Sequence, residues 1–234
     1  GCVTAVPGYF KRIREICDRY GVLLILDEVM CGMGRTGTRY ACEQEGIAPD
    51  LLTVAKGLGA GYQPIGAVLI AEKIHRAIER GSNVVMHGHT FTAHPVACAA
   101  AVATQNEIRQ HDLLANVKRQ GAALLKALHE RFDAHPHVGD IRGRGLFLAL
   151  EFVADRRTKR PFDPALKVSS RVKDVGMENG LICYPAGGIV DGKVGDHAMI
   201  APAYIVNETH IAEIVDKLGR TVDAVLREAV AKAA

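Results

Sequence analysis

The sequence Gly21-Val-Leu-Leu-Ile-Leu26, followed at once by Asp27-Glu28, decides the fold class of this 234-residue chain. An unbroken apolar run that ends in polar residues is typical of a parallel strand covered by helices on both faces. A second apolar run, Leu51–Ala55, ends at Lys56, and a third covers residues 65–70. Amphipathic stretches with a helical period lie on either side of these runs. The pattern predicts an α/β protein.

The same periodicities place the remaining elements and suggest two domains. After residue 134 the pattern changes, so we expect a first domain over residues 1–133 and a smaller α/β or α+β domain over residues 134–234. Helices are expected over residues 7–20, 72–79, 94–110, 112–132, 166–179 and 211–225, and strands over residues 22–26, 51–54, 65–70, 146–152, 181–184 and 198–200.

Composition excludes several classes of protein. The chain is 48% hydrophobic and 24% charged with a net charge of +3, which is ordinary for a globular protein. It has no basic block, no Trp and only 5% aromatic residues, so no nucleic-acid partner is expected. No apolar run reaches the roughly 18–20 residues of a membrane span, so no membrane partner is expected. Six cysteines without a C-x-x-C spacing indicate reduced thiols and a cytoplasmic protein.

Asp27 and Lys56 are the residues most indicative of chemistry. A carboxylate at the carboxyl end of a buried strand lies where open α/β sheets bind ligands, although a helix cap or a structural ion pair is an equal alternative. Lys56 precedes Gly57-Leu-Gly-Ala-Gly61, and a desolvated lysine can form a Schiff base with a carbonyl. Its alternatives are a snorkelling strand-end lysine or a point charge for phosphate. An acid and a lysine on neighbouring strands are what pyridoxal phosphate requires.

The segment Gly32-Met-Gly-Arg-Thr-Gly37 matches the spacing G-x-G-x-x-G. A dinucleotide fold places these glycines directly after a strand and at the start of an apolar helix. Here Asp27-Glu28 intervenes, and residues 38–45 form only a weakly amphipathic stretch. The segment is therefore interpreted as a tight surface turn, and a nicotinamide-binding oxidoreductase is kept as a rival function.

Two further motifs have ordinary explanations beside functional ones. His87, His89 and His94 include an H-x-H pair, but no acidic or cysteine partner lies at helical spacing, so loop hydrogen bonding is favoured and no metal is expected. Thr90 could donate its hydroxyl group to a phosphate. Arg142-Gly-Arg-Gly145 is either an anion-binding loop or a glycine-bent strand entry with two solvated arginines.

In this order, the motifs resemble the class III pyridoxal-phosphate-dependent aminotransferases of fold type I, and here the carboxyl-terminal half of such a protein. The resemblance covers nearly the whole chain, and its specific part is the acidic element followed by Ala-Lys-Gly. The matching text is Asp27-Glu-Val-Met-Cys-Gly-Met-Gly-Arg-Thr-Gly37, Ala48-Pro-Asp-Leu-Leu-Thr-Val-Ala-Lys-Gly-Leu58, Gly61-Tyr-Gln-Pro-Ile-Gly66, Gly88-His-Thr-Phe91, His94-Pro95 and Arg142-Gly-Arg-Gly-Leu146.

The resemblance implies a transferase that moves an amino group between an amine or amino acid and a keto acid or aldehyde. By the same resemblance, Lys56 forms the Schiff base with pyridoxal 5'-phosphate and is the catalytic residue. Asp27 pairs with the pyridinium nitrogen, Val29 packs on the ring, and Thr90 binds the phosphate of the neighbouring site in a homodimer. Residues 1–133 would then be part of the cofactor-binding large domain.

The resemblance also defines what is missing and which related activities remain open. The family usually has Phe where Met33 stands, and it carries an amino-terminal segment with a phosphate-binding loop and a ring-stacking aromatic residue. We therefore expect the chain to be a fragment whose own activity is uncertain. An aminomutase or a decarboxylase of the same family is an alternative, although Gly34-Arg-Thr-Gly37 favours the transaminases. An inactive remnant that folds only with a partner is a further rival.

Overall fold

A computed structural model describes residues 1–233, which divide by their internal contacts into two units. One unit is Ala5–Ala115, and the other combines Gly1–Thr4 with the chain from Asn116 onward. The division falls near the start of helix α4 (Leu113–Phe132). The domain boundary between residues 133 and 134 stays a prediction. None of the helices in the described residues has the length and apolar character needed to cross a membrane.

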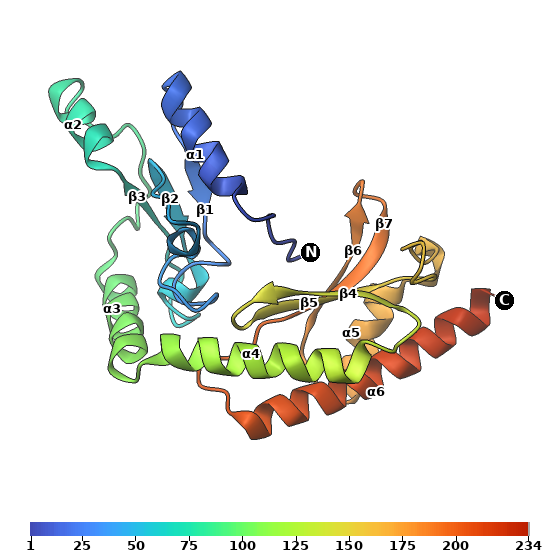
Figure 1. The fold of residues 1–234 in the computed structure, drawn as a ribbon. Helices are drawn as coiled ribbons and strands as arrows, with labels where there is room; N and C mark the ends of the chain where they lie inside the picture. Colours follow the sequence, from blue (N-terminus) through green and yellow to red (C-terminus); the bar gives the residue numbers. More distant parts are fainter. Residues whose placement is uncertain (234) are drawn as a thin grey trace. The chain divides into compact units, whose positions relative to one another are not determined.

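The unit Ala5–Ala115 contains a three-stranded sheet in the order β1-β2-β3 (Figure 1). Strands β1 and β2 are parallel, with Asp27 opposite Thr53, whereas β3 runs antiparallel to β2. The elements are α1 (Tyr9–Tyr20), β1 (Ile25–Asp27), the 3-10 helix η1 (Ala41–Glu45), β2 (Leu51–Val54), the 3-10 helix η2 (Lys56–Leu58), β3 (Ala67–Ile70), α2 (Glu72–Arg80) and α3 (Pro95–Gln110).

The core of this unit is small. Met33, Leu52 and Val54 are buried together, and Leu26 and Leu58 are among the partly buried side chains packed against them. By contrast, Ile25 of β1 is 60% exposed, and no side chain of α1 is buried among the described residues. Within residues 1–233, the side of β1 that carries Ile25 is therefore largely exposed, whereas Leu24 just before the strand is buried.

A buried carboxylate, Asp50, links three parts of the unit Ala5–Ala115. Asp50 is 4% exposed. It accepts a hydrogen bond of 2.7 Å from the Leu24 amide and forms an ion pair of 2.9 Å with Arg14 of α1. Lys73 of α2 completes the set of partners. Lys73, together with the Leu24 amide and Arg14, holds the pKa of Asp50 well below its usual range despite burial. This carboxylate therefore joins α1, the start of β1 and α2.

The second unit is a four-stranded antiparallel sheet in the order β4-β5-β7-β6, with three helices on one face (Figure 1). Its apolar face buries Leu148, Leu150 and Phe152 of β5 together with Ala198 of β7 against side chains of the helices. The sheet is entirely antiparallel, which is the α+β alternative expected for this part. The elements are α4, β4 (Val138–Arg144), β5 (Phe147–Phe152), the 3-10 helix η3 (Pro164–Leu166), α5 (Val168–Glu178), β6 (Tyr184–Val190), β7 (Val194–Ile200) and α6 (Glu208–Ala233).

Candidate active site

The carboxyl ends of β1 and β2 form the candidate site. Because the two strands are parallel neighbours, both end at the same edge of the sheet. Asp27 is the last residue of β1, and the amide of Glu28 continues the ladder with a 3.0 Å hydrogen bond to the Thr53 carbonyl oxygen. Lys56 follows two residues after the end of β2. The structure thus places Asp27 and Lys56 at one edge, on adjacent strands.

Asp27 and Val29 are joined by a local hydrogen bond. The Val29 amide donates to Oδ1 of Asp27 at 2.9 Å, the geometry of a turn in which an Asp side chain accepts from the amide two residues ahead. The Asp27 side chain is exposed, and Val29 is half-buried. The bond fixes the Asp27 carboxylate beside Val29 and leaves its second oxygen available to a ligand.

Glu28 has a structural role that contrasts with that of its neighbour. It is 3% exposed and accepts hydrogen bonds from the amides of Ala41 at 2.6 Å and Cys42 at 2.7 Å. Both amides belong to the first turn of η1, where a carboxylate is the preferred partner. Burial, reinforced by the Glu28 charge, raises the pKa of Cys42 to about 12 and keeps this thiol protonated. Successive side chains thus point to opposite sides, as alternation in a strand requires.

The glycine-rich segment after β1 is a series of turns. A Cβ on Gly32 would lie 2.8 Å from the Glu28 carbonyl oxygen, so only glycine fits there. Gly34 and Gly37 have φ values of 101° and 98°, which glycine adopts without strain. The segment leads to bends and then to η1, not directly into an α-helix. The context of a dinucleotide-binding motif is therefore absent from this loop.

Lys56 occupies an unusual backbone conformation. Its φ is 38°, in the left-handed region that costs energy for a residue with a Cβ. The turn is closed by hydrogen bonds of 2.8 Å from the Leu58 amide to the Ala55 carbonyl oxygen and from the Ala60 amide to the Lys56 carbonyl oxygen. The side chain is exposed, and within residues 1–233 its amine makes no hydrogen bond or ion pair. The amine is therefore available to a ligand.

A residue that the sequence did not indicate, Gln105, contacts the same turn. Its Nε2 donates hydrogen bonds of 3.0 Å to the carbonyl oxygens of Gly57 and Leu58. Gln105 lies on α3, nearly fifty positions along the chain, and it follows no motif. Only the three-dimensional structure brings this residue to the turn that carries Lys56.

Within the described chain, Thr90 makes no hydrogen bond to the residues at this edge. Thr90 is exposed in the segment between α2 and α3, and no hydrogen bond among residues 1–233 joins it to Asp27, Val29 or Lys56. Nearby, the rings of His87 and His89 pack edge to face with centroids 5.1 Å apart. The described residues contain no group of three His, Cys, Asp or Glu side chains arranged to hold a metal.

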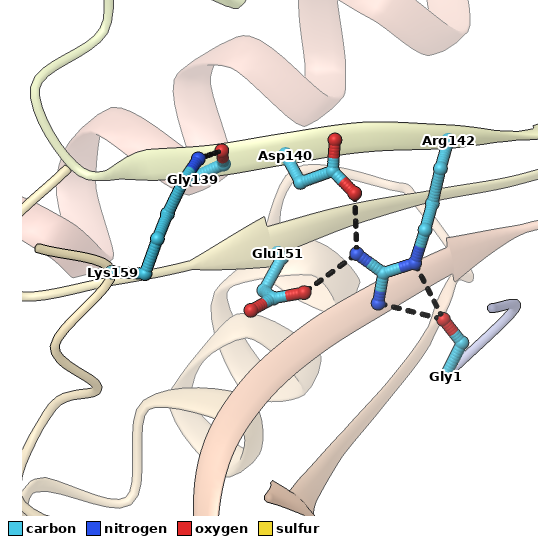
Figure 2. Close-up of polar contacts among 6 residues, drawn as sticks. All are labelled: Gly1, Gly139, Asp140, Arg142, Glu151 and Lys159. Carbon is cyan, nitrogen blue, oxygen red and sulfur yellow. Dashed lines mark hydrogen bonds and ion pairs between the residues drawn. The ribbon is translucent and has the colours of Figure 1, made fainter. Parts of the chain in front are cut away.

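Figure 2 shows that Arg142 is held in an ion-pair network of the second unit. Its Nη1 lies 2.9 Å from Asp140 and 2.6 Å from Glu151, and its guanidinium also donates to the Gly1 carbonyl oxygen. The side chain is only 12% exposed. The interpretation as a glycine-bent strand is right, because Arg142 and Gly143 belong to β4 and Gly143 has a φ of 139°. Its solvated arginine is wrong for Arg142, and two carboxylates already balance the charge that an anion would need. The residue stabilises the β4-β5 pair.

Solved structures similar to this chain are transaminases. A transaminase from the marine bacterium Virgibacillus superposes with a TM-score of 0.91 at 34% identity, covering 97% of this chain and 51% of the other. An amine transaminase from an uncultivated Pseudomonas species, solved in its pyridoxal-phosphate-bound form, superposes with a TM-score of 0.85 at 37% identity, covering 94% and 48%. The chain thus has the fold of type I transaminases.

The chain belongs to the class III aminotransferase family, whose sequence model matches residues 1–222. An uncharacterized aminotransferase of Schizosaccharomyces pombe is 48% identical over 222 residues, which are 95% of this chain and 48% of that protein. The diaminobutyrate–2-oxoglutarate transaminase of Halomonas elongata is 37% identical, covering 100% of this chain and 50% of that protein. The chain therefore spans about half the length of the curated relatives it matches.

Proposed function

We propose that the protein is a pyridoxal-phosphate-dependent transaminase that moves an amino group between an amine or amino acid and a keto acid or aldehyde. The observation that carries this proposal is the placement of Asp27 and Lys56 at the ends of adjacent parallel strands, in a chain of the class III family. The proposal concerns the whole protein to which these residues belong, because the chain spans half of its relatives' length.

The donor set fits the cofactor. Asp27 offers an exposed carboxylate whose orientation is fixed by the Val29 amide, which suits a protonated ring nitrogen. Lys56 offers an exposed amine with no partner in residues 1–233, which suits an aldehyde carbon. Val29 lies between them in sequence as an apolar, half-buried contact for the face of a ring. When bound, pyridoxal phosphate supplies an electron sink for charge that develops on the substrate carbon.

Each residue then has a defined task. The Lys56 amine would hold the aldehyde carbon of the cofactor, and the same amine would move a proton at the substrate Cα as a general base. Asp27 keeps the ring nitrogen protonated, so that a charge developing in the transition state is stabilised. Val29 restricts the orientation of the ring by packing.

Replacement of Lys56 tests the proposal directly. We expect the purified protein to bind pyridoxal phosphate with a visible absorbance band that borohydride removes, and Lys56→Ala to abolish the band and the transfer of amino groups. Lys11→Ala, at an exposed position of α1, is the matched control and should keep both. A band that persists in Lys56→Ala would show that another lysine binds the cofactor. A nicotinamide enzyme would give no such band.

Replacement of Asp27 separates binding from electron withdrawal. Asp27→Asn keeps the shape of the side chain but removes the negative charge opposite the ring nitrogen, so we expect the visible band to remain. The rate of the first half-reaction should fall about 100-fold or more, the scale for loss of one electrostatic contact in a transition state. Stopped-flow absorbance measures this rate, and a variant as fast as the wild type would remove Asp27 from the mechanism.

We also propose an acceptor substrate, a homodimeric assembly and a cytoplasmic location for the protein. The name of the Halomonas elongata relative supports a 2-oxo acid as acceptor, which a panel of donors and acceptors would test. Six free cysteines support a reducing, cytoplasmic environment. A homodimer in which Thr90 binds the phosphate of the neighbouring site is supported by exposed apolar side chains around this residue. These side chains are Val84, Val85, Met86 and Phe91, with exposures of 54%, 62%, 90% and 77%.

A further inference from the structure

The hydrogen bonds of the Lys56 turn show a dependence on α3. The Lys56 carbonyl oxygen accepts from the amides of Gly59 and Ala60, and the Gly59 carbonyl oxygen accepts from the Tyr62 amide. The two carbonyl groups between them, those of Gly57 and Leu58, accept hydrogen bonds from the Gln105 side chain. A single amide group thus completes the turn from outside it.

The orientation of the Gln105 amide is determined by its partners. Both partners are carbonyl oxygens, which only accept, so the donating –NH₂ end must face them. The side chain is half-buried, and it lines a cavity of about 460 Å³ that Leu58 and Met33 also border. Leu58 packs on Met33, Leu52 and Val54, so the turn is held by apolar contact on one side and by Gln105 on the other.

Because the backbone at Lys56 is strained, losing the Gln105 hydrogen bonds would change its conformation. A residue with a Cβ keeps a φ of 38° only where its surroundings over-determine the conformation. Local turn hydrogen bonds supply part of that constraint, and Gln105 is the polar contact from another element. Without its two hydrogen bonds, the turn can relax toward an ordinary φ, and the direction in which the Lys56 amine leaves the backbone changes.

We propose that Gln105 is a positioning residue that holds the Lys56 turn in its left-handed conformation, so that the amine meets the cofactor aldehyde in a reactive orientation. The proposal rests on the proposed role of Lys56. Gln105 touches neither substrate nor cofactor in this scheme and acts only through the backbone of residues 57 and 58.

Two substitutions and a matched control test the proposal. Gln105→Leu removes the donors, and Gln105→Glu keeps size and polarity but offers only acceptors to the two carbonyl oxygens. Gln110→Leu changes the same residue type at an exposed position of the same helix. The readout is the rate at which the visible band appears when pyridoxal phosphate is added to the cofactor-free protein.

We expect both Gln105 variants to form the band at least about tenfold more slowly, since a small displacement of a reacting group carries a cost of this order. The final amplitude should be unchanged, with Gln105→Glu as slow as Gln105→Leu and Gln110→Leu like the wild type. A role limited to stability would lower the amplitude and the unfolding midpoint but not the rate. Rates within twofold of the wild type in both variants would overturn the proposal.

Amide hydrogen exchange keeps the proposal testable if a variant folds poorly or if no band forms. In the wild-type, cofactor-free protein we expect the Gly59 and Ala60 amides to be protected, and in Gln105→Glu to exchange at least about tenfold faster, because the turn opens more often. Unprotected amides in the wild type would overturn the proposal. Absence of a band in the wild type, or its persistence in Lys56→Ala, would instead refute the proposed function and leave this exchange result standing.

Discussion

Asp50 and Asp18 both bind Arg14, but in different surroundings. The Asp50 side chain is 5% exposed and has partners on two helices and at Leu24, just before β1, whereas the Asp18 side chain is 65% exposed and pairs with Arg14 within α1 at 2.7 Å. Removing one member of a buried ion pair leaves the other charges without compensation, whereas an exposed pair contributes little. The two carboxylates therefore form a matched pair for measuring the contribution of burial.

We expect Asp50→Asn to lower the free energy of unfolding by about 3 kcal/mol at neutral pH, and Asp18→Asn to change it by about 0.5 kcal/mol or less. The pKa of Asp50 is lowered in the folded protein, so its stabilisation is present above the pKa of an unfolded aspartate, about 3.9, and is lost as the pH falls below it. Urea unfolding from pH 7 to pH 3 measures both effects. An acid loss as steep in Asp50→Asn as in the wild type would contradict this assignment.

At the scale of single residues, the sequence predicts part of the candidate site. Asp27 and Lys56 could be placed because each follows an apolar strand, and strand alternation separates Asp27 from Glu28. The role of Glu28 in anchoring η1 could not be predicted, because its partners are backbone amides thirteen and fourteen residues ahead. Gln105 could not be predicted either, since its contact depends on how α3 packs.

At the scale of elements, the helices were predicted well, but strands of the second unit were misplaced. The predicted strand over residues 181–184 begins too early, because β6 starts only at Tyr184. Leu181 lies in the turn after α5, where its amide donates to the Gly176 carbonyl oxygen at 2.8 Å and Gly180 has a φ of 70°. The strand β6 then runs through Gly187 and Gly188 with a register shift, a stretch that reads as a loop in sequence. Strand β4 was missed because its exposed face carries charged residues.

Substitutions at two buried glycines test the helix packing in the second unit. A Cβ on Gly121 of α4 would lie 2.5 Å from the backbone of Gly145, whereas a Cβ on Gly219 of α6 would lie 2.6 Å from the side chain of Arg131, which is 36% exposed. Backbone cannot move aside cheaply, but an exposed side chain can. We expect Gly121→Ala to destabilise by about 1–3 kcal/mol through overpacking, and Gly219→Ala to stabilise by up to about 0.5 kcal/mol through helix propensity.

Thermal and urea unfolding of the two variants compare these costs under the same conditions. The prediction is the sign of the difference: Gly121→Ala should be clearly less stable than Gly219→Ala. Equal stabilities would mean that α4 shifts away from the turn at Gly145 without cost. That result would show that the α4–β5 junction is looser than the close approach of Gly121 to Gly145 indicates.

At the scale of the whole molecule, burial separates the two units. The second unit encloses a contiguous core in which Leu124, Leu128, Phe132 and Leu218 have no exposed surface. The unit Ala5–Ala115 instead leaves apolar side chains of β1 and of the segment before α3 exposed, such as Ile25 and Met86. Composition could not predict this contrast, because both parts have an ordinary share of apolar residues. Exposed apolar surface of this kind is typical of a surface that another chain or segment covers.

The proposed dimer, with Thr90 serving the neighbouring site, makes a prediction about mixed dimers. Thr90→Val removes only the hydroxyl group, so alone it should weaken cofactor binding about tenfold or more, the scale of a hydrogen bond to a charged group. In a dimer of one Lys56→Ala and one Thr90→Val protomer, one site carries both substitutions and the other carries neither. Equal co-expression should therefore restore about a quarter of the wild-type activity in the whole mixture, measured at a cofactor concentration too low to load Thr90→Val, because about half of the dimers are mixed and each has one intact site. If Thr90 served its own site, every site would carry one substitution, and the mixture would show no more activity than the average of the separate variants.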